Sequence, residues 1–144
     1  MQNRETRVGV GVFVLKGGKF LMLKRQGSHG AGSWSLPGGN LDFGESFEQT
    51  ARREVSEEAD IEITNVRFGA VTNDIFAGEN KHYVTIWMLS DWKSGEVRNM
   101  EPAQCTAQSW HTFDDLPSPL FFSWNQLFES DFLEAIKFQL RQET

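Results

Sequence analysis

The sequence has 144 residues, a length that predicts a single domain over residues 1–144, because hydrophobic cores usually divide only in longer chains. Hydrophobic residues make up 39% of the chain and aromatic residues 12%, which is enough for a packed core and excludes wholesale disorder. Twenty acidic residues against 14 basic ones give a formal charge of -6 without a long basic run, which argues against a nucleic acid polymer as partner.

Cysteine content and hydropathy indicate the compartment. The single cysteine, Cys105, excludes an intrachain disulfide and a cysteine-rich zinc site, and it favours a reducing environment. The apolar stretch 8–15 is too short for a membrane span and lacks the cleavage site of a signal peptide. We therefore expect a cytoplasmic domain with no membrane partner.

The first third of the chain predicts a hairpin followed by a loop. The β-branched run Val8–Val14 is typical of a buried central strand. The glycine turn within Lys16–Lys19 then leads into a second strand at Phe20–Leu23. Residues 27–44 are rich in glycine, which predicts a long loop rather than a regular element.

A helix from Ser46 to about Glu58 is the clearest element of the sequence. Ser46 and Gln49 have the spacing of a capping box, and the apolar residues that follow keep the spacing of one helix face. Further elements are predicted along the rest of the chain: strands at Ile61–Ile63, Val66–Val71 and Tyr83–Leu89, a polar connection at Gly78–Lys81, a short edge strand at Trp110–Phe113, and a mainly helical segment at Asn125–Leu140. These elements predict a mixed sheet with helices.

Three glutamates crowd one part of the predicted helix. Glu54 lies three residues before Glu57 and four before Glu58, so their carboxylates project from neighbouring turns onto one surface. One explanation is a solvated acidic face, which is the usual role of a charge run. The other is a cation site, for which oxygen ligands without clustered Cys or His suit Mg²⁺ or Mn²⁺ better than zinc. A cation site of this kind implies hydrolysis of a phosphate ester or anhydride.

Residues 39–61 resemble the signature of the Nudix hydrolases, in which Gly, Glu and the segment Arg-Glu-apolar-x-Glu-Glu-x-Gly-apolar follow one another at fixed spacing. Asp60 stands where the signature has its last glycine, at the end of the helix, where a left-handed residue is expected and Asp is well tolerated. Further segments extend the resemblance over most of the chain. They are similar to a subgroup that holds a human diphosphatase of thiopurine nucleotides and 8-oxo-dGTP and plant cytosolic enzymes.

The resemblance implies an α+β fold in which a mixed, curved β-sheet is sandwiched between α-helices, an α/β/α sandwich. It implies four ligands for Mg²⁺, with Mn²⁺ as an alternative: Glu54, Glu57, Glu58 and the carbonyl of Gly38. One of the three glutamates would orient or deprotonate the attacking water. Glu45 and Arg53 are expected to complete the catalytic group by shaping the loop and the helix.

The same resemblance places five residues around the substrate: Arg25, Ser35, Asn40, Thr85 and Phe122. Phe122 can stack on a purine, although a member of a Phe-Phe pair is also a common core residue. Near relatives carry one more acidic residue at the position of Thr106. Either Glu101 or another acid takes that role here, or the acids of the signature act alone.

The leading functional expectation is a diphosphatase that hydrolyses normal or oxidised (deoxy)nucleoside triphosphates, such as 8-oxo-dGTP, to a monophosphate and pyrophosphate. Two alternatives stay open. The same chemistry can act on a nucleotide sugar, a pterin triphosphate or a prenyl diphosphate, or the domain can bind nucleotides without catalysis. The resemblance also implies a homodimer as the assembly.

Overall fold

The computed structural model describes residues 5–27 and 29–141, so the two ends of the predicted domain and Ser28 lie outside the described residues. The elements, in which η marks a short 3₁₀ helix, follow in the order β1 (Thr6–Lys16), β2 (Lys19–Arg25), β3 (Trp34–Ser35), β4 (Gly38–Asn40), α1 (Phe47–Ala59), β5 (Glu62–Phe76), η1 (Ala77–Glu79), β6 (Lys81–Ser94), β7 (Cys105–His111), η2 (Phe113–Asp115), α2 (Ser123–Phe128) and α3 (Leu133–Arg141). In this described part, no helix combines the length and the apolar composition needed to cross a bilayer.

Strand β1 is the centre of the sheet, as its β-branched sequence predicts. It pairs antiparallel with β2 and β4 and parallel with β6. The strand order is β3-β2-β1-β6-β5, with β7 added to β2. The turn pairs Lys16 with Lys19, which confirms the predicted hairpin. Because parallel and antiparallel pairs coexist, the sheet is mixed, as expected.

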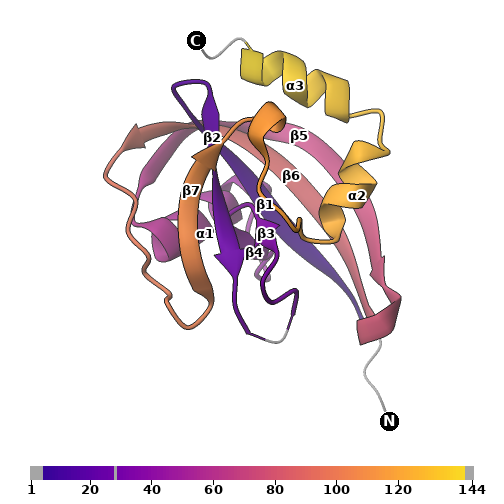
Figure 1. The fold of residues 1–144 in the computed structure, drawn as a ribbon. Coiled ribbons are helices and arrows are strands. Elements are labelled where there is room, and N and C mark those ends of the chain that lie inside the picture. Colours follow the sequence, from indigo (N-terminus) through magenta and orange to yellow (C-terminus); the bar gives the residue numbers. More distant parts are fainter. Residues whose placement is uncertain (1–4, 28, 142–144) are drawn as a thin grey trace.

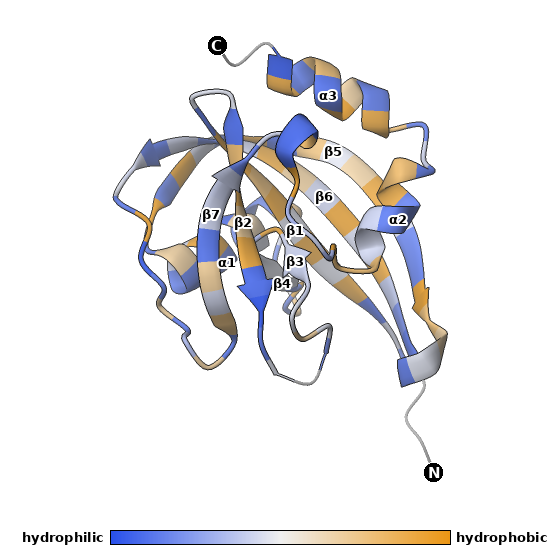
Figure 2. Cartoon of the chain, viewed as in Figure 1, coloured by the Kyte–Doolittle hydropathy of each residue, from blue (hydrophilic) through white to orange (hydrophobic). Residues whose placement is uncertain are grey.

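Helices cover both faces of the sheet. Figure 1 shows α1 on one side and α2 and α3 on the other, which confirms the predicted sandwich. Alternate residues of β1 supply the two core layers, because successive side chains of a strand point to opposite faces. Val10, Val12 and Val14 pack with α1, while Phe13 and Leu15 pack with α2 and α3. The central strands are accordingly the most hydrophobic part of the ribbon (Figure 2).

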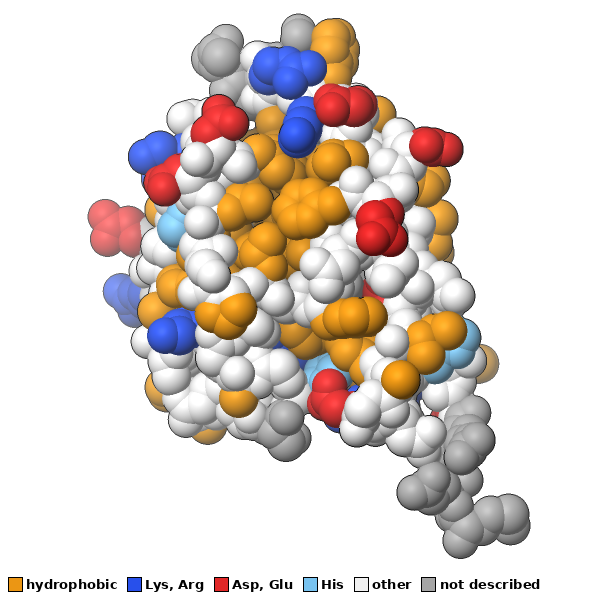
Figure 3. Space-filling view, turned by 45° about the vertical axis from the view of Figure 1, so that its right-hand side comes forward, with side chains coloured by type: hydrophobic (Ala, Val, Ile, Leu, Met, Phe, Trp, Pro, Cys, Tyr) orange, Lys and Arg blue, Asp and Glu red, His pale blue; other side chains and the backbone are white. Residues whose placement is uncertain are grey.

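The face that carries α2 is rich in aromatic side chains. Figure 3 shows hydrophobic side chains gathered in the middle of this side of the molecule, with charged side chains mostly around them. Trp124 of α2 is fully buried there, with ring centroids 5.4 Å from Trp87 and 5.8 Å from Phe13. Aromatic pairs at this spacing add to the stability given by their buried area.

The caps of α1 are those that its sequence predicts. The Ser46 hydroxyl accepts a hydrogen bond from the backbone N–H of Gln49, and the Gln49 side chain accepts one from the backbone N–H of Ser46. This reciprocal pair is the capping box. At the other end Asp60 has φ 56° and ψ 37°, the left-handed conformation expected of the glycine that it replaces.

Several predicted boundaries were wrong, and the segment predicted as a loop at residues 27–44 contains the short strands β3 and β4. The strands predicted at Ile61–Ile63 and Val66–Val71 form one strand, β5, which begins after Ile61 and passes through an irregularity at Asn65 with φ 51°. The edge strand predicted at Trp110–Phe113 is β7, which begins at Cys105 and ends before Phe113. The strand is longer than predicted because β7 pairs with β2 from Phe20 to Arg25, and this pairing stabilises it despite the weak strand propensity of its polar residues.

The helical segment predicted at Asn125–Leu140 is two helices, α2 and α3. Ser130 lies between them, where its hydroxyl donates to the carbonyl of Leu127 and accepts from the backbone N–H of Phe132. Side-chain bonds of this kind compete with the helical ladder, which explains the break. The polar connection predicted at Gly78–Lys81 includes the end of η1 and the left-handed residue Asn80.

Candidate active site

Two of the signature glutamates share a cavity with a third acid. Glu54 and Glu58 project from neighbouring turns of α1, and Glu101 reaches the same space from the segment between β6 and β7. We call this space the acidic cavity. Its remaining lining residues are Leu23, Arg25, Gln26, Ser35, Leu36, Gly38, Gln104 and Cys105. Glu101 lies 43 residues after Glu58 in the sequence, so the fold brings it to the two helix acids.

The buried carboxylate of Glu58 accepts a hydrogen bond of 2.7 Å from the backbone N–H of Gly38. Burial, together with the negative charges of Glu54 and Glu101, raises the pKa of Glu58 to about 8 against the opposing effects of Gly38 and Arg25. Burial also raises the pKa of Glu54. Burial therefore opposes full ionisation of the two carboxyl groups together unless a cation shares the cavity.

The glycines before α1 allow this close approach. A side chain at Gly38 would collide with the backbone carbonyl of Val10, and a Cβ atom at Gly39 would lie 2.5 Å from the carboxyl carbon of Glu54. Both contacts are far inside van der Waals distance. The two glycines therefore let strand β4 lie between β1 and the acidic face of α1.

Arg53 ties the loop before α1 to the helix. Its guanidinium forms a two-pronged pair with Glu45, with bonds of 2.8 and 2.9 Å, and donates to the carbonyl of Asn40 at 3.2 Å. Arg53 also contacts Glu54 at 2.6 Å. Hydrogen bonds from Arg53 and Thr50 lower the pKa of Glu45 to about 2. Neither Arg53 nor Glu45 is among the described residues that line the acidic cavity, so their geometry is that of positioning residues.

Glu57 lies apart from the other two glutamates. Its side chain is 51% exposed and its nearest charged partner is Arg53 at 3.4 Å, and it is not among the cavity-lining residues of the described chain. Glu101 lines the acidic cavity together with Glu54 and Glu58. Backbone bonds from Arg98 to the carbonyl of Ala59 and from Met100 to the carbonyl of Glu58 hold the segment that carries Glu101 against the end of α1.

The donors of the acidic cavity fit a hard divalent cation. They are carboxylate oxygens, and their pKa values are raised by burial and by repulsion between the acids, effects that a bound cation would offset. Across residues 5–27 and 29–141, however, no three Asp, Glu, His or Cys side chains form a ready-made cage. A site for Mg²⁺ does not require such a cage, because Mg²⁺ keeps several waters and takes further ligands from substrate phosphates. The backbone N–H of Gly38, rather than its carbonyl, makes the observed contact with the acids.

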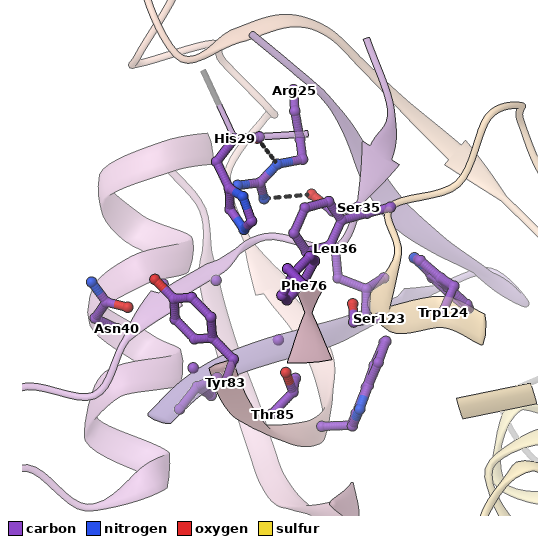
Figure 4. Close-up of a pocket in the computed structure, with 17 residues that line it drawn as sticks. Arg25, His29, Ser35, Leu36, Asn40, Phe76, Tyr83, Thr85, Ser123 and Trp124 are labelled. Carbon is purple, nitrogen blue, oxygen red and sulfur yellow. Dashed lines mark hydrogen bonds between the residues drawn. The ribbon is translucent and has the colours of Figure 1, made fainter. Parts of the chain in front are cut away.

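A second cavity adjoins the first. We call it the aromatic cavity (Figure 4), because rings from several elements line it: Phe76 of β5, Tyr83 and Trp87 of β6, Phe121, and Trp124 of α2. Its other lining residues are Gly9, Val10, Gly11, Arg25, His29, Ser35, Leu36, Gly38, Gly39, Asn40, Thr85 and Ser123. Its volume is ≈ 260 Å³. Gly9 and Gly11 of β1 leave its sheet side free of side-chain bulk.

Arg25 lies between the two cavities and lines both. Its guanidinium donates to the carbonyl of His29 at 3.0 Å and to the hydroxyl of Ser35 at 3.3 Å (Figure 4), and it lies 4.1 Å from the ring centre of Phe121. Burial lowers the pKa of Arg25, although the negative charge of Glu58 opposes this effect. Arginine stays charged in proteins, so this side chain offers a fixed cation between the acids and the rings.

Four of the five residues predicted around the substrate line the aromatic cavity: Arg25, Ser35, Asn40 and Thr85. Phe122 does not line it, since its side chain lies against Phe76, and its neighbour Phe121 takes that place. Tyr83 was missed as a pocket residue, whereas Trp87 has one of the two places that its sequence suggests, core or pocket wall. The alternation of Tyr83 with Thr85 along one strand is a signal that could have found it, because residues two apart share a face.

Comparison with known proteins identifies the family to which the chain belongs. Residues 5–132 match the family described as NUDIX domain. The fold is that of an α+β domain, and the chain belongs to the Nudix family.

Its relatives carry several activities in their names. The chain is similar in structure to a MutT NUDIX hydrolase from Burkholderia pseudomallei, with a TM-score of 0.81 and 35% identity over 88% of this chain and 98% of that one. It is 37% identical over 108 residues to "Putative 8-oxo-dGTP diphosphatase 3" of Mycobacterium tuberculosis, which covers 69% of this chain and 49% of the relative. It is also 31% identical over 97 residues to the NAD-capped RNA hydrolase NudC of Photorhabdus laumondii, which covers 67% of this chain and 36% of the relative. The chain thus spans between a third and a half of these curated relatives.

Proposed function

We propose that this protein is a Mg²⁺-dependent diphosphatase of nucleoside triphosphates, which releases a nucleoside monophosphate and pyrophosphate. The observation that carries the proposal is the junction of the two cavities. Carboxylates lie on one side, aromatic rings lie on the other, and Arg25 and Gly38 line both. A nucleotide has the same order of parts: phosphates that bind cations, followed by a base that stacks on rings.

The acidic cavity supplies the groups that the hydrolysis needs. Glu54 and Glu58 would hold Mg²⁺, which when bound neutralises charge on the phosphate oxygens and favours ionisation of a water. A carboxylate of this cavity takes the proton of the attacking water. The water oxygen then bonds to phosphorus while the bridging oxygen leaves on the other phosphate. Arg25 is placed to offset the negative charge of the phosphate chain.

The size of the aromatic cavity favours a compact head group. Its volume of ≈ 260 Å³ is close to the lower end of ligand pockets, about 300 Å³. A purine base between rings suits this space better than a long prenyl chain. The name of the Mycobacterium relative, a diphosphatase of 8-oxo-dGTP, is consistent with an oxidised purine as the base.

A second candidate function is hydrolysis of the pyrophosphate of a dinucleotide. The observation in its favour is the similarity to NudC proteins, which are named for NAD-capped RNA and reach 32% identity with this chain. Both reactions break a phosphoric anhydride beside a nucleoside, so they use the acidic cavity in the same way. They differ in the group that leaves, which lies outside the base pocket.

The test is a panel of substrates for the purified protein with Mg²⁺. It contains the normal (deoxy)nucleoside triphosphates, 8-oxo-dGTP, NAD, a nucleotide sugar and a prenyl diphosphate. Products are separated by ion exchange, so that pyrophosphate, phosphate and monophosphates are distinguished. Selective formation of a monophosphate and pyrophosphate from a triphosphate supports the proposal. Turnover of NAD alone supports the second candidate. If the protein binds these compounds but hydrolyses none of them, both candidates are contradicted.

A further inference from the structure

A chain of hydrogen bonds runs beneath the aromatic cavity. The indole N–H of Trp87 donates to Thr72 Oγ1 at 2.9 Å, and Thr72 Oγ1 donates to Asp74 Oδ2 at 3.2 Å. Thr85 Oγ1 donates to the same oxygen, Asp74 Oδ2, at 2.5 Å. Trp87 and Thr85 line the cavity, while Asp74 is fully buried. The chain therefore couples a buried acid to two residues of the pocket wall.

The donor direction in this chain is determined at two points. An indole nitrogen can only donate, so Thr72 must accept from Trp87 and pass its own proton to Asp74. An ionised carboxylate can only accept, so Thr85 must also donate to Asp74. The direction is the same if Asp74 is protonated on Oδ1, because both hydroxyls contact Oδ2.

The hydroxyl of Thr85 consequently faces the cavity as an acceptor. Its single proton is used by Asp74, and only its lone pairs remain for a ligand. Figure 4 shows the Thr85 side chain at the base of the cavity, between Tyr83 and Ser123. A ligand that places a donor there gains a hydrogen bond. A ligand that places an acceptor or an apolar atom there leaves a buried polar group unpaired, which is costly.

The buried carboxyl group of Asp74 lowers the stability of the folded protein. Burial raises its pKa against the two hydroxyl bonds, and its Oδ1 atom finds no hydrogen-bond partner among the described residues. A buried polar atom without a partner costs stability, so such atoms are rare and usually have a role outside folding. Asp74 lies next to Thr72 and Thr85, so its role can be to orient the hydroxyl groups of these two residues.

We propose that Asp74 is a specificity-determining positioning residue, which holds the Thr85 hydroxyl as an acceptor and thereby selects nucleotides that present a hydrogen-bond donor to it. The donor is an N–H of the base or a hydroxyl of the sugar, since both are donors of similar reach. Asp74 acts through Thr85 and does not itself touch the ligand. This inference rests on the proposed function, because it concerns the same pocket.

The experiment measures kcat/KM for matched substrates that differ by one donor. The pairs are dGTP and dITP for the 2-amino group, dATP and purine deoxyriboside triphosphate for the 6-amino group, and GTP and dGTP for the 2′-hydroxyl. We expect the wild-type protein to prefer the donor-bearing member of one pair by at least about tenfold. The pair that shows the preference identifies the source of the donor.

Three variants separate selectivity from folding. Asp74→Leu and Thr85→Val are each expected to reduce the preference to about twofold, and the double variant to reduce it no further, because both changes remove one interaction. Asp74→Asn is the conservative control, since its amide oxygen can still accept both hydroxyl protons, and it should keep the preference. Melting temperatures are measured for all variants, and Asp74→Ser replaces Asp74→Leu if the latter fails to fold.

The outcomes separate the two proposals. If the wild-type protein hydrolyses no triphosphate, the proposed function is wrong. If it does so but with equal kcat/KM in every pair, or if Asp74→Leu and Asp74→Ser keep the wild-type preference, only the role of Asp74 is refuted. A loss of activity that is equal for both members of each pair would show a structural role and would also overturn the inference.

Discussion

Glu58 and Gly38 are joined by a hydrogen bond of 2.7 Å, which links the last turn of α1 to strand β4. This bond holds the carboxylate between the two cavities, since Gly38 lines both. Glu58 therefore both stabilises the loop in front of the helix and offers an oxygen ligand to a cation in the acidic cavity. Five predictions can test this arrangement and its surroundings.

The first prediction separates the three glutamates of the signature. Glu54→Gln and Glu58→Gln should each lower kcat by at least about 100-fold, because each removes a charged ligand for Mg²⁺. Glu57→Gln is the matched control on the same helix and should lower it by less than about tenfold, since Glu57 lies outside the acidic cavity. Circular dichroism checks that all three fold. Equal losses in the three variants would contradict the distinction.

The second prediction concerns the third acid. Glu101→Gln should lower kcat by about tenfold or more, because Glu101 shares the acidic cavity with Glu54 and Glu58. Thr106→Ala is the control, because Thr106 is exposed. Activity at saturating Mg²⁺ and the Mg²⁺ concentration for half-maximal rate are both measured. An unchanged Glu101→Gln variant would mean that the signature acids act alone.

The third prediction is a pH effect on the metal-free protein. The pKa of Glu58 is raised to about 8, so between about 4.3 and 8 the folded protein holds a proton that the unfolded chain has lost. The free energy of unfolding in EDTA should therefore fall as the pH rises through this range. Glu58→Gln should remove this part of the slope, and Mg²⁺ should restore stability to the wild-type protein at pH 8. Parallel pH profiles of the two proteins would refute the assignment.

The fourth prediction tests the pair of Arg53 and Glu45. Arg53→Lys and Glu45→Gln should each lower the melting temperature at pH 7, because neither can keep the two-pronged bond. The double variant should lower it little more than the larger single change. The pKa of Glu45 is lowered to about 2, so its contribution is present above about 4.3 and is lost as the pH falls towards 2. The effect of Glu45→Gln should shrink over that range.

The fifth prediction uses the departure from the family signature. Asp60→Gly should raise the free energy of unfolding by about 0.5 kcal/mol, because relief of left-handed strain exceeds the entropy cost of glycine. Ser56→Gly, inside the same helix, is the matched control and should lower the free energy of unfolding by about 0.5 kcal/mol. Urea unfolding measures both. A destabilised Asp60→Gly variant would show that the Asp side chain has a role of its own.

Local patterns in the sequence were sufficient to predict the helix and its acidic face. The capping box at Ser46 and the spacing of Glu54 and Glu58 depend only on neighbouring residues, so they could be recognised without tertiary information. The place of Glu101 could not, because it depends on backbone bonds between its segment and the end of α1. The full length of β7 was missed for a similar reason, since its strand character comes from pairing with β2.

The residues of the aromatic cavity also divide into those that local sequence predicts and those that depend on tertiary packing. Tyr83 and Trp87 share a face with Thr85 by simple alternation, and this face could have been predicted. Phe76 and Phe121 come from distant segments that only the packing of the C-terminal region brings together, with ring centroids 5.5 Å apart. Trp124 also belongs to this packing, because α2 covers the sheet there.

Gly9 and Gly11 leave space at the base of the aromatic cavity, and small substitutions at these positions can change the depth of the cavity. A Cβ atom at Gly9 would lie 3.5 Å from the Tyr83 ring, and one at Gly11 would lie 4.0 Å from Leu36 and Trp87, which are ordinary contacts. Alanine at either position would thus be accepted by the fold while it made the pocket shallower. Substrate range in descendants of this chain can therefore change by single small steps in the central strand, without any change to the acids that perform the chemistry.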